Sequence, residues 1–250
     1  YAALRKLACM SAIYHLKEIV KTRATNGTGF RLVIPSIRIE DREAIALVGY
    51  SGCGKSTLLD VLAMILRPDE AARFTFIPRG ENPIDVAAAW TKRDQNRLGD
   101  LRKKHLGYVL QTGGLLPYLT VRDNINLSRR LLGMPEDGSV EHLAKVLGIQ
   151  RHLGKLPGLL SAGERQRVAF ARALAHRPSI VIADEPTASL DPITARKIMG
   201  AVMELVKEIG VTFIAASHDW AQIYKHDFRS LHQDSRERDG GRWIESTFKD

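Results

Sequence analysis

The sequence predicts an α/β fold built around a mainly parallel β-sheet. Three observations support this prediction. Short apolar segments with strand character alternate with segments whose apolar residues recur at helical spacing. A glycine-rich segment, "GYSGCGKST", separates a predicted strand from a predicted helix, and a later apolar strand, "SIVIADEP", ends in two acidic residues. Strands that alternate with helices are typical of a parallel sheet.

The first half of the chain begins with strands and then turns helical. Alternating and β-branched apolar residues predict three short strands, at 14–20, 30–39 and 43–49. Apolar residues at helical spacing predict a helix at 55–66, which ends at "RPDE". Two more strands are predicted, a short one at 74–78 and a buried one at 105–111.

The second half combines a helical insertion with further strands. The pattern at 112–178 is mostly helical, with breaks at Pro117, "GMPEDG" and "LPGLLSAG". After it come a strand at 179–186, a helix at about 192–209, a strand at 211–218, and a tail that turns at a Gly-Gly pair into a hairpin. We expect one domain over 1–250, with the β part and catalytic core at 1–111 and 179–250 and a helical lobe at about 112–178.

Composition narrows the functional classes. The chain has 250 residues, 26% of them charged, and a formal net charge of +9. No apolar run approaches the roughly 18–20 residues that span a bilayer, and the first residues lack the pattern of a secretory signal. Two cysteines provide no disulfide framework, which fits a reducing cytoplasm. Basic residues are mixed with acidic and apolar ones throughout, which favours a surface near an anionic ligand over a nucleic-acid interface.

The glycine-rich segment predicts a phosphate-binding loop. Residues Gly49 to Ser56 match G-x-x-x-x-G-K-[ST] between a strand and a helix, the context that this motif requires. Lys55 is expected to reach the β- and γ-phosphates of a nucleotide, Ser56 to ligate Mg²⁺ and Thr57 to hold the α-phosphate. The rest of the loop consists of Gly49, Tyr50, Ser51, Gly52, Cys53 and Gly54.

Two further segments carry chemistry. Asp184, at the end of its strand, is expected to bind Mg²⁺ opposite Ser56, and Glu185 to polarise an attacking water. In "LSAGE", small residues precede a helix, where free backbone N–H groups favour an anion. Ser161 and Glu164 have the spacing of a capping box, and that reading is compatible with an anion site.

Six motifs, in order, resemble those of the nucleotide-binding domain of ABC transporter ATPases, over nearly the whole chain. "GYSGCGKST" resembles the Walker A motif of this P-loop NTPase family, "LSAGE" its signature and "IVIADE" its Walker B motif. Gln111 in "YVLQTGG" resembles the Q-loop, Asp191 in "SLD" the D-loop and His218 in "AASHD" the switch histidine. The resemblance implies the ABC ATPase fold, with an N-terminal antiparallel β part and an inserted helical lobe.

The resemblance also implies how two phosphate-binding turns serve one reaction. In this family two domains pack head to tail, so that the signature of one binds the γ-phosphate held by the Walker A motif of the other. ATP and Mg²⁺ are the implied cofactors. Gln111 would sense Mg²⁺ and the attacking water, His218 would contact the γ-phosphate, and Asp191 would lie at the dimer interface. The signature contacts would come from Ser161, Ala162, Gly163 and Glu164.

The chain departs from the family pattern in its signature and at the expected base platform. Ala162 replaces the usual glycine of the signature and Glu164 the usual glutamine. Arg23 stands about where the family commonly places an aromatic residue under the adenine. Its planar guanidinium could stack on the base, or Phe30 could substitute.

Two functional classes follow from the resemblance. One is a Mg²⁺-dependent ATPase that acts without nucleic acid and binds integral membrane subunits at the cytoplasmic side of the inner membrane. Such a subunit would contact Leu115, Leu116, Tyr118 and Leu119, but ordinary packing of a helical lobe explains these apolar residues equally well. "LLPYLTVRDNI" and "ADEPTASLD" most resemble the bacterial subgroup of lipoprotein-release, macrolide-efflux and cell-division ATPases, several of which drive periplasmic movements of their membrane partner. The alternative is a soluble ABC ATPase that acts on nucleic acid or ribosomes. The short spacing from Lys55 to Asp184 and the presence of one phosphate loop argue against that alternative.

Overall fold

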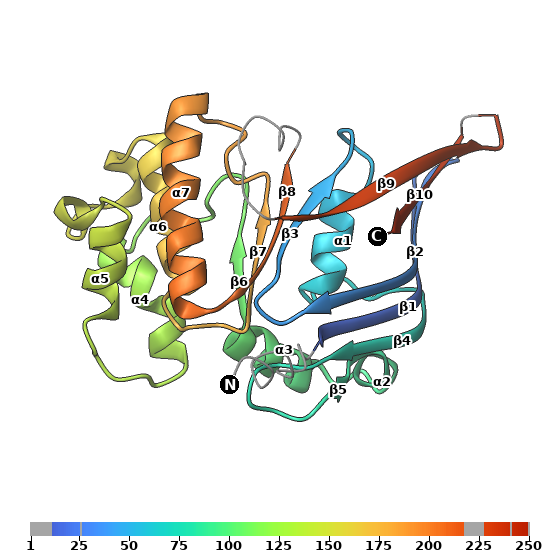
Figure 1. The fold of residues 1–250 in the computed structure, drawn as a ribbon, viewed down its shortest axis with the longest axis horizontal. Helices are drawn as coiled ribbons and strands as arrows, with labels where there is room; N and C mark the ends of the chain where they lie inside the picture. The colour runs from blue at the N-terminus through green and yellow to red at the C-terminus, as the bar shows by residue number, and fades with distance from the viewer. Residues whose placement is uncertain (1–11, 26, 218–227, 241, 250) are drawn as a thin grey trace, which may run out of the picture.

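The fold is a ten-stranded mixed sheet with helices on both faces (Figure 1). The computed structural model describes residues 12–25, 27–217, 228–240 and 242–249. The strands are β1 (Ala12–Thr25), β2 (Thr28–Glu40), β3 (Ala44–Val48), β4 (Glu70–Phe76), β5 (Ile84–Asp85), β6 (Leu106–Val109), β7 (Ile180–Asp184), β8 (Thr212–Ser217), β9 (Arg229–Arg238) and β10 (Trp243–Lys249). The helices are α1 (Lys55–Leu62), α2 (Val86–Thr91), α3 (Gln95–His105), α4 (Val121–Leu131), α5 (Ser139–Val146), α6 (Ala162–Leu174) and α7 (Pro192–Ile209).

The sheet has a parallel part and an antiparallel part. The strand order is β5-β4-β1-β2-β10-β9-β3-β8-β7-β6, and the strands from β9 to β6 pair in parallel with one another. The strands from β5 to β2 pair antiparallel. The β9–β10 hairpin joins the two parts, because β10 is antiparallel to β9 and parallel to β2. The predicted fold class and the predicted terminal hairpin are confirmed.

The parallel strands separate two hydrophobic cores. Alternate residues of one strand point to opposite faces, so Ile182 of β7 packs in the core that contains α1, while Val181 packs in the core that contains α6 and α7. Figure 1 shows the same arrangement, with α1 on one side of these strands and α4 to α7 on the other. Burial on both faces explains why the "IVIA" segment of β7 is continuously apolar. Helices α1 and α6 therefore lie on opposite faces of the sheet.

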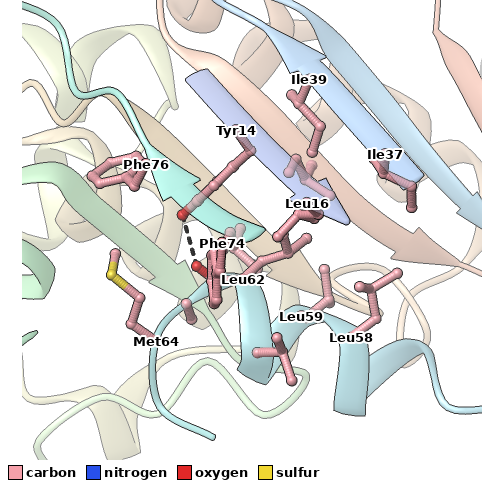
Figure 2. Close-up of a cluster of buried hydrophobic side chains, with 14 of the residues drawn as sticks. Tyr14, Leu16, Ile37, Ile39, Leu58, Leu59, Leu62, Met64, Phe74 and Phe76 are labelled. Atoms are coloured by element: carbon pink, nitrogen blue, oxygen red, sulfur yellow. Dashed lines mark hydrogen bonds between the residues drawn. The ribbon is translucent and has the colours of Figure 1, made fainter. Parts of the chain in front are cut away.

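The antiparallel part packs over α1 through aromatic and aliphatic side chains (Figure 2). The fully buried Tyr14 donates a hydrogen bond to the carbonyl oxygen of Leu62 at 2.7 Å, and burial raises the pKa of its hydroxyl. Its ring lies with its centroid 4.9 Å from that of Phe76 and 6.1 Å from that of Phe74. This core joins β1 to the end of α1, the helix that follows the glycine-rich loop.

Several boundaries differ from the predicted ones. Strands β1 and β2 form one long antiparallel ladder that extends beyond the predicted segments on both sides. Helix α1 ends at Leu62 and not at residue 66. The sequence predicts no element at 84–104, which contains β5, α2 and most of α3, and His105, predicted to begin a strand, is the last residue of α3. The missed signals were the aspartate caps Asp85 and Asp94, whose carboxylates accept backbone N–H groups, and the sparse apolar stripe of α3.

His176 makes the stability of this fold sensitive to acid. Its ring is 5% exposed, its Nε2 lies 3.1 Å from the carbonyl oxygen of Leu106, and burial lowers its pKa to about 4. As the pH falls, the imidazole of the unfolded chain is protonated near pH 6.5, whereas that of the folded chain is protonated only near pH 4. The stability that neutral His176 contributes is therefore fully present above pH 6.5 and is lost as the pH falls toward 4. We expect the titration of His176 to lower the free energy of unfolding by about 2 kcal/mol as the pH falls from 7 to 5.

Urea unfolding of the wild type and of His176→Gln at both pH values measures this effect. The variant starts from a different stability at pH 7, so the informative quantity is the drop between the two pH values. That drop is expected to be smaller in the variant. Equal drops in both proteins would show that His176 does not cause the acid sensitivity.

Candidate functional site

The glycine-rich loop lies between β3 and α1 and depends on backbone conformations that glycine tolerates. Gly52 and Gly54 have φ angles of 77° and 94°, in the left-handed region. Gly54 is also the residue that caps α1, and a Cβ atom there would lie 2.1 Å from Cζ of Phe30. The loop and the ring of Phe30 are therefore packed together, and Gly54 has no space for a side chain.

Lys55 crosses beneath the loop. Its Nζ donates to the carbonyl oxygens of Gly49 and Tyr50, both at 2.8 Å, and the residue is 4% exposed. Among the residues that the structure describes, no carboxylate forms an ion pair with this ammonium group. Two neutral oxygens hold Lys55 in position without neutralising its charge, so the positive charge remains available to an anion bound in the loop.

Several predicted residues meet at one edge of the sheet. Strands β3, β8, β7 and β6 are parallel neighbours, so their carboxyl ends lie at the same edge. This edge places the glycine-rich loop after β3, Asp184 and Glu185 at the end of β7, and Gln111 just after β6. His218 lies outside the described residues, directly after β8.

Asp184 has the environment of a cation ligand. Its Oδ1 is buried and has no hydrogen-bond partner among the described residues, which is costly for a carboxylate unless a cation completes the site. The negative charge of Asp184 also raises the pKa of Asp60 on α1, after the larger effect of burial. The described residues contain no cluster of three or more potential metal ligands. A buried, unpartnered carboxylate oxygen such as that of Asp184 suits Mg²⁺, which is usually held by one or two protein carboxylates together with phosphate oxygens and water.

Glu185 is held by its backbone at the end of β7. Its N–H donates to the carbonyl oxygen of Ala216 on β8 at 3.0 Å, and its φ angle is 43°, which is unusual outside glycine. Such conformations often occur at functional sites, where the surrounding structure fixes them. The backbone of Glu185 therefore has a fixed position next to Asp184.

The two candidates for the base platform are paired residues of one ladder. Arg23 of β1 lies opposite Phe30 of β2. Phe30 packs against Gly54, and the Nη2 atom of Arg23 lies 3.9 Å from Oδ2 of Asp60 on α1. Both residues are thus next to the loop and its helix, and their contact with a base remains a prediction.

The "LSAGE" turn forms the capping box that its spacing predicts. Ser161 caps α6, and its Oγ accepts the N–H of Glu164 at 3.3 Å. Oε2 of Glu164 accepts both the N–H and the hydroxyl of Ser161 at 2.9 Å. These hydrogen bonds, the backbone one first, lower the pKa of Glu164. Ser161 is exposed, so the N-terminus of α6 is open to an anion.

The structure brings the "LSAGE" and "SLD" turns together. A Cβ atom on Gly163 would lie 3.3 Å from Cγ2 of Thr194, in the first turn of α7. Asp191 caps this helix and accepts the N–H groups of Ile193 at 3.1 Å and Thr194 at 2.9 Å. Hydrogen bonds from Thr194 are the main reason why the pKa of Asp191 is lowered. Because α6 and α7 cover the face opposite α1, these turns belong to the other face of the sheet from the helix that carries Lys55.

Sequence reasoning missed four side chains near the candidate site. Tyr108 donates to Oδ1 of Asp60 at 3.1 Å beside Asp184, and its pKa is raised mainly by burial. His152 and Arg151 approach Glu164 from a short 3₁₀ turn, Gln150–His152. The acidic residue five positions after Lys55, within an otherwise apolar helix, was a signal for Asp60. The approach of His152 depends on a chain reversal that no local pattern predicts.

Comparison with known proteins places these features in a family. A family model described as "ABC transporter" matches residues 34–188. The chain is 37% identical, over 78% of its length and 82% of the relative's, to the lipoprotein-releasing system ATP-binding protein LolD of Hyphomonas neptunium. It is 36% identical, over 73% of its length and 70% of the relative's, to the bacitracin export ATP-binding protein BceA of Halalkalibacterium halodurans.

Solved structures agree with the sequence comparisons. A dimeric post-hydrolysis structure of the ATP-binding cassette MJ0796, bound to ADP and phosphate, matches with a TM-score of 0.72 and 28% identity. The match covers 88% of this chain and 93% of that one. CbiO1 of Clostridium perfringens, described as part of the ABC transporter complex CbiONQ, matches with a TM-score of 0.69 and 31% identity, over 84% and 79% of the two chains.

Proposed function

This chain belongs to the ABC transporter family, and we propose from that premise that it is the subunit that powers a membrane complex. It is an ATPase, which converts ATP and water into ADP and phosphate, and it is the ATP-binding subunit of an ABC transporter. Its partners are a second ATPase subunit and integral membrane subunits. The proposed finer function is that ATP-driven, head-to-tail dimerisation transmits movement to those membrane subunits.

One observation carries the phosphate chemistry. Within the described part of the chain, the Lys55 ammonium has no paired carboxylate and Oδ1 of Asp184 has no hydrogen-bond partner, and both residues lie at the same edge of the sheet. The backbone of the loop and Lys55 would hold the β- and γ-phosphates, and Thr57 the α-phosphate. Ser56 and Asp184, with Gln111 nearby, would hold Mg²⁺. When bound, the ion offsets negative charge on the phosphate oxygens. Glu185 would orient the attacking water and accept its proton, and His218 would contact the γ-phosphate.

The composite site is supported by the placement of α6. The "LSAGE" turn begins α6 on one face of the sheet, whereas the glycine-rich loop leads into α1 on the opposite face. The two helices that follow the phosphate-binding turns therefore do not face each other within one chain. Two copies arranged head to tail would bring Ser161 and Gly163 of one copy to the nucleotide of the other, with Asp191 nearby. Dimeric structures of the related cassette MJ0796 support the pairing of two copies.

Docking on a membrane subunit is supported by apolar residues after β6. Tyr118 is 73% exposed and Leu110 46% exposed, while Leu115, Leu116 and Leu119 beside them are partly buried. No helix among the described residues is long and apolar enough to cross a membrane. We place the chain at the cytoplasmic side of the inner membrane, bound to its partner there, as expected for a subunit related to LolD.

Co-purification from detergent-solubilised membranes tests this proposal. A tagged chain is expected to retain an integral membrane protein, and Tyr118→Glu is expected to reduce its recovery about tenfold, since a buried charge without a partner strongly weakens an interface. Leu131→Glu is the matched control, because Leu131 is 64% exposed at the other end of α4. Co-purification of ribosomes or nucleic acid in place of a membrane protein would favour the alternative function.

A further inference from the structure

Glu164 holds two partners with its two carboxylate oxygens. Oε2 accepts the N–H and the hydroxyl of Ser161, both at 2.9 Å. Oε1 lies 2.9 Å from Nε2 of His152, and Nη2 of Arg151 lies farther away, at 3.9 Å. The carboxylate is therefore shared between the residue that caps α6 and an imidazole on a separate turn.

His152 is built into this position. It is 4% exposed, and its Nδ1 is buried and has no hydrogen-bond partner in the part of the chain that the structure describes. Nε of Arg151 also lies 3.0 Å from Nε2 of His152, but one ring nitrogen cannot both accept from Arg151 and donate to Glu164. We assign the hydrogen to Nε2, because the carboxylate can only accept, whereas the side chain of Arg151 is 81% exposed and can donate to water. The unpartnered Nδ1 then carries a lone pair and no buried N–H.

The bond from Ser161 to Glu164 opposes the proposed role of Ser161. A hydroxyl has one hydrogen, and here it points to Oε2 of Glu164, so it cannot donate to a phosphate at the same time. The carboxylate also places a negative charge within a few ångströms of the position where a γ-phosphate would arrive, which costs energy through like-charge repulsion. A second donor that holds the carboxylate reduces both effects.

We propose that His152 is a positioning residue for the composite site: it holds the Glu164 carboxylate and so frees the Ser161 hydroxyl for the γ-phosphate of the neighbouring chain. This inference rests on the proposed head-to-tail function. Under this proposal, Glu164, which replaces the usual glutamine of the signature, has His152 of the same chain as its partner. It also predicts that His152 matters only because Glu164 carries a charge.

A double-mutant cycle tests this dependence. ATP-driven dimerisation is measured by light scattering in a Glu185→Gln parent, which is expected to bind ATP without turning it over. His152→Leu is expected to raise the ATP concentration needed for half-maximal dimerisation about fivefold, as for coupled neighbouring residues. In a Glu164→Gln background the same change is expected to cost less than about twofold. His152→Gln, whose amide can still donate, is expected to recover part of the loss.

The outcomes separate the two levels of the proposal. If the Glu185→Gln parent binds ATP and stays monomeric, the composite-site function is contradicted. If it dimerises and His152→Leu costs the same in both backgrounds, the proposed function stands and His152 is only a packing residue. Steady-state kinetics in chains that keep Glu185 provide a second readout. The His152→Leu defect is expected in kcat more than in KM, because the phosphate clamp completes the site after ATP has bound to the loop.

Discussion

Replacing Glu185 by glutamine is expected to lower the rate of ATP hydrolysis by about 10²-fold or more, the scale of a lost general base. The amide keeps the size of the side chain and its backbone bond to Ala216, but it cannot accept the proton of the attacking water. ATP binding is expected to persist, because Lys55 and the loop are unchanged. Phosphate release measures the rate, and a fluorescent ATP analogue measures binding.

The same variant is expected to accumulate as an ATP-bound dimer, since the closed state would no longer be released by hydrolysis. Glu136→Gln is the matched control, because it removes a carboxylate from an exposed position in the helical segment. It is expected to hydrolyse ATP at the wild-type rate. Turnover close to wild type in Glu185→Gln would show that Glu185 is not the general base. Another acidic residue would then have to accept the proton of the attacking water.

Local chemistry explains which parts of the site could be predicted from the sequence. The conformation of the glycine-rich loop depends on the positive φ angles of Gly52 and Gly54. The turn at Ser161 depends on the capping box that Ser161 forms with Glu164, three residues later. Both features are therefore specified within short segments. The position of Asp184 follows from a strand that is apolar on both faces and then ends. These features need no information from distant parts of the chain.

The missed features depend on long-range packing. Strand β10 pairs in parallel with β2, from the other end of the chain, and no sequence period specifies that choice. The Asp60–Tyr108 bond joins residues 48 positions apart. Helix α3 buries little beyond Leu98, Leu101 and His105, so its many polar residues obscure the helical period of its apolar ones. His152 reaches Glu164 because the chain folds back between these two residues. Secondary-structure propensities do not predict such a reversal.

Two inactive variants are expected to restore activity to each other if the composite site is correct. Lys55→Ala removes the cation beneath the phosphate loop, and it is expected to abolish most hydrolysis with the fold intact. Gly163→Asp puts a carboxylate beside Ser161, where it would repel the γ-phosphate. A Cβ at Gly163 already lies 3.3 Å from Cγ2 of Thr194, so Gly163→Ala is the control that keeps this steric change without the charge. Thermal unfolding of each single variant without nucleotide shows whether its loss of activity is a loss of fold.

Mixing the two inactive chains then identifies which chain's signature serves which nucleotide. In a head-to-tail heterodimer, one site combines both defects, while the other combines the intact Lys55 of one chain with the intact Gly163 of its partner. Up to about one working site per heterodimer is expected, as the symmetry of a two-site dimer requires.

If hydrolysis needs both sites, turnover stays low but ATP is still trapped at the intact site, so trapping must be measured alongside phosphate release. If each signature instead served the nucleotide of its own chain, every site in the mixture would carry a defect. Neither turnover nor trapping would then appear, and the two phosphate-binding turns of this chain would need a different explanation.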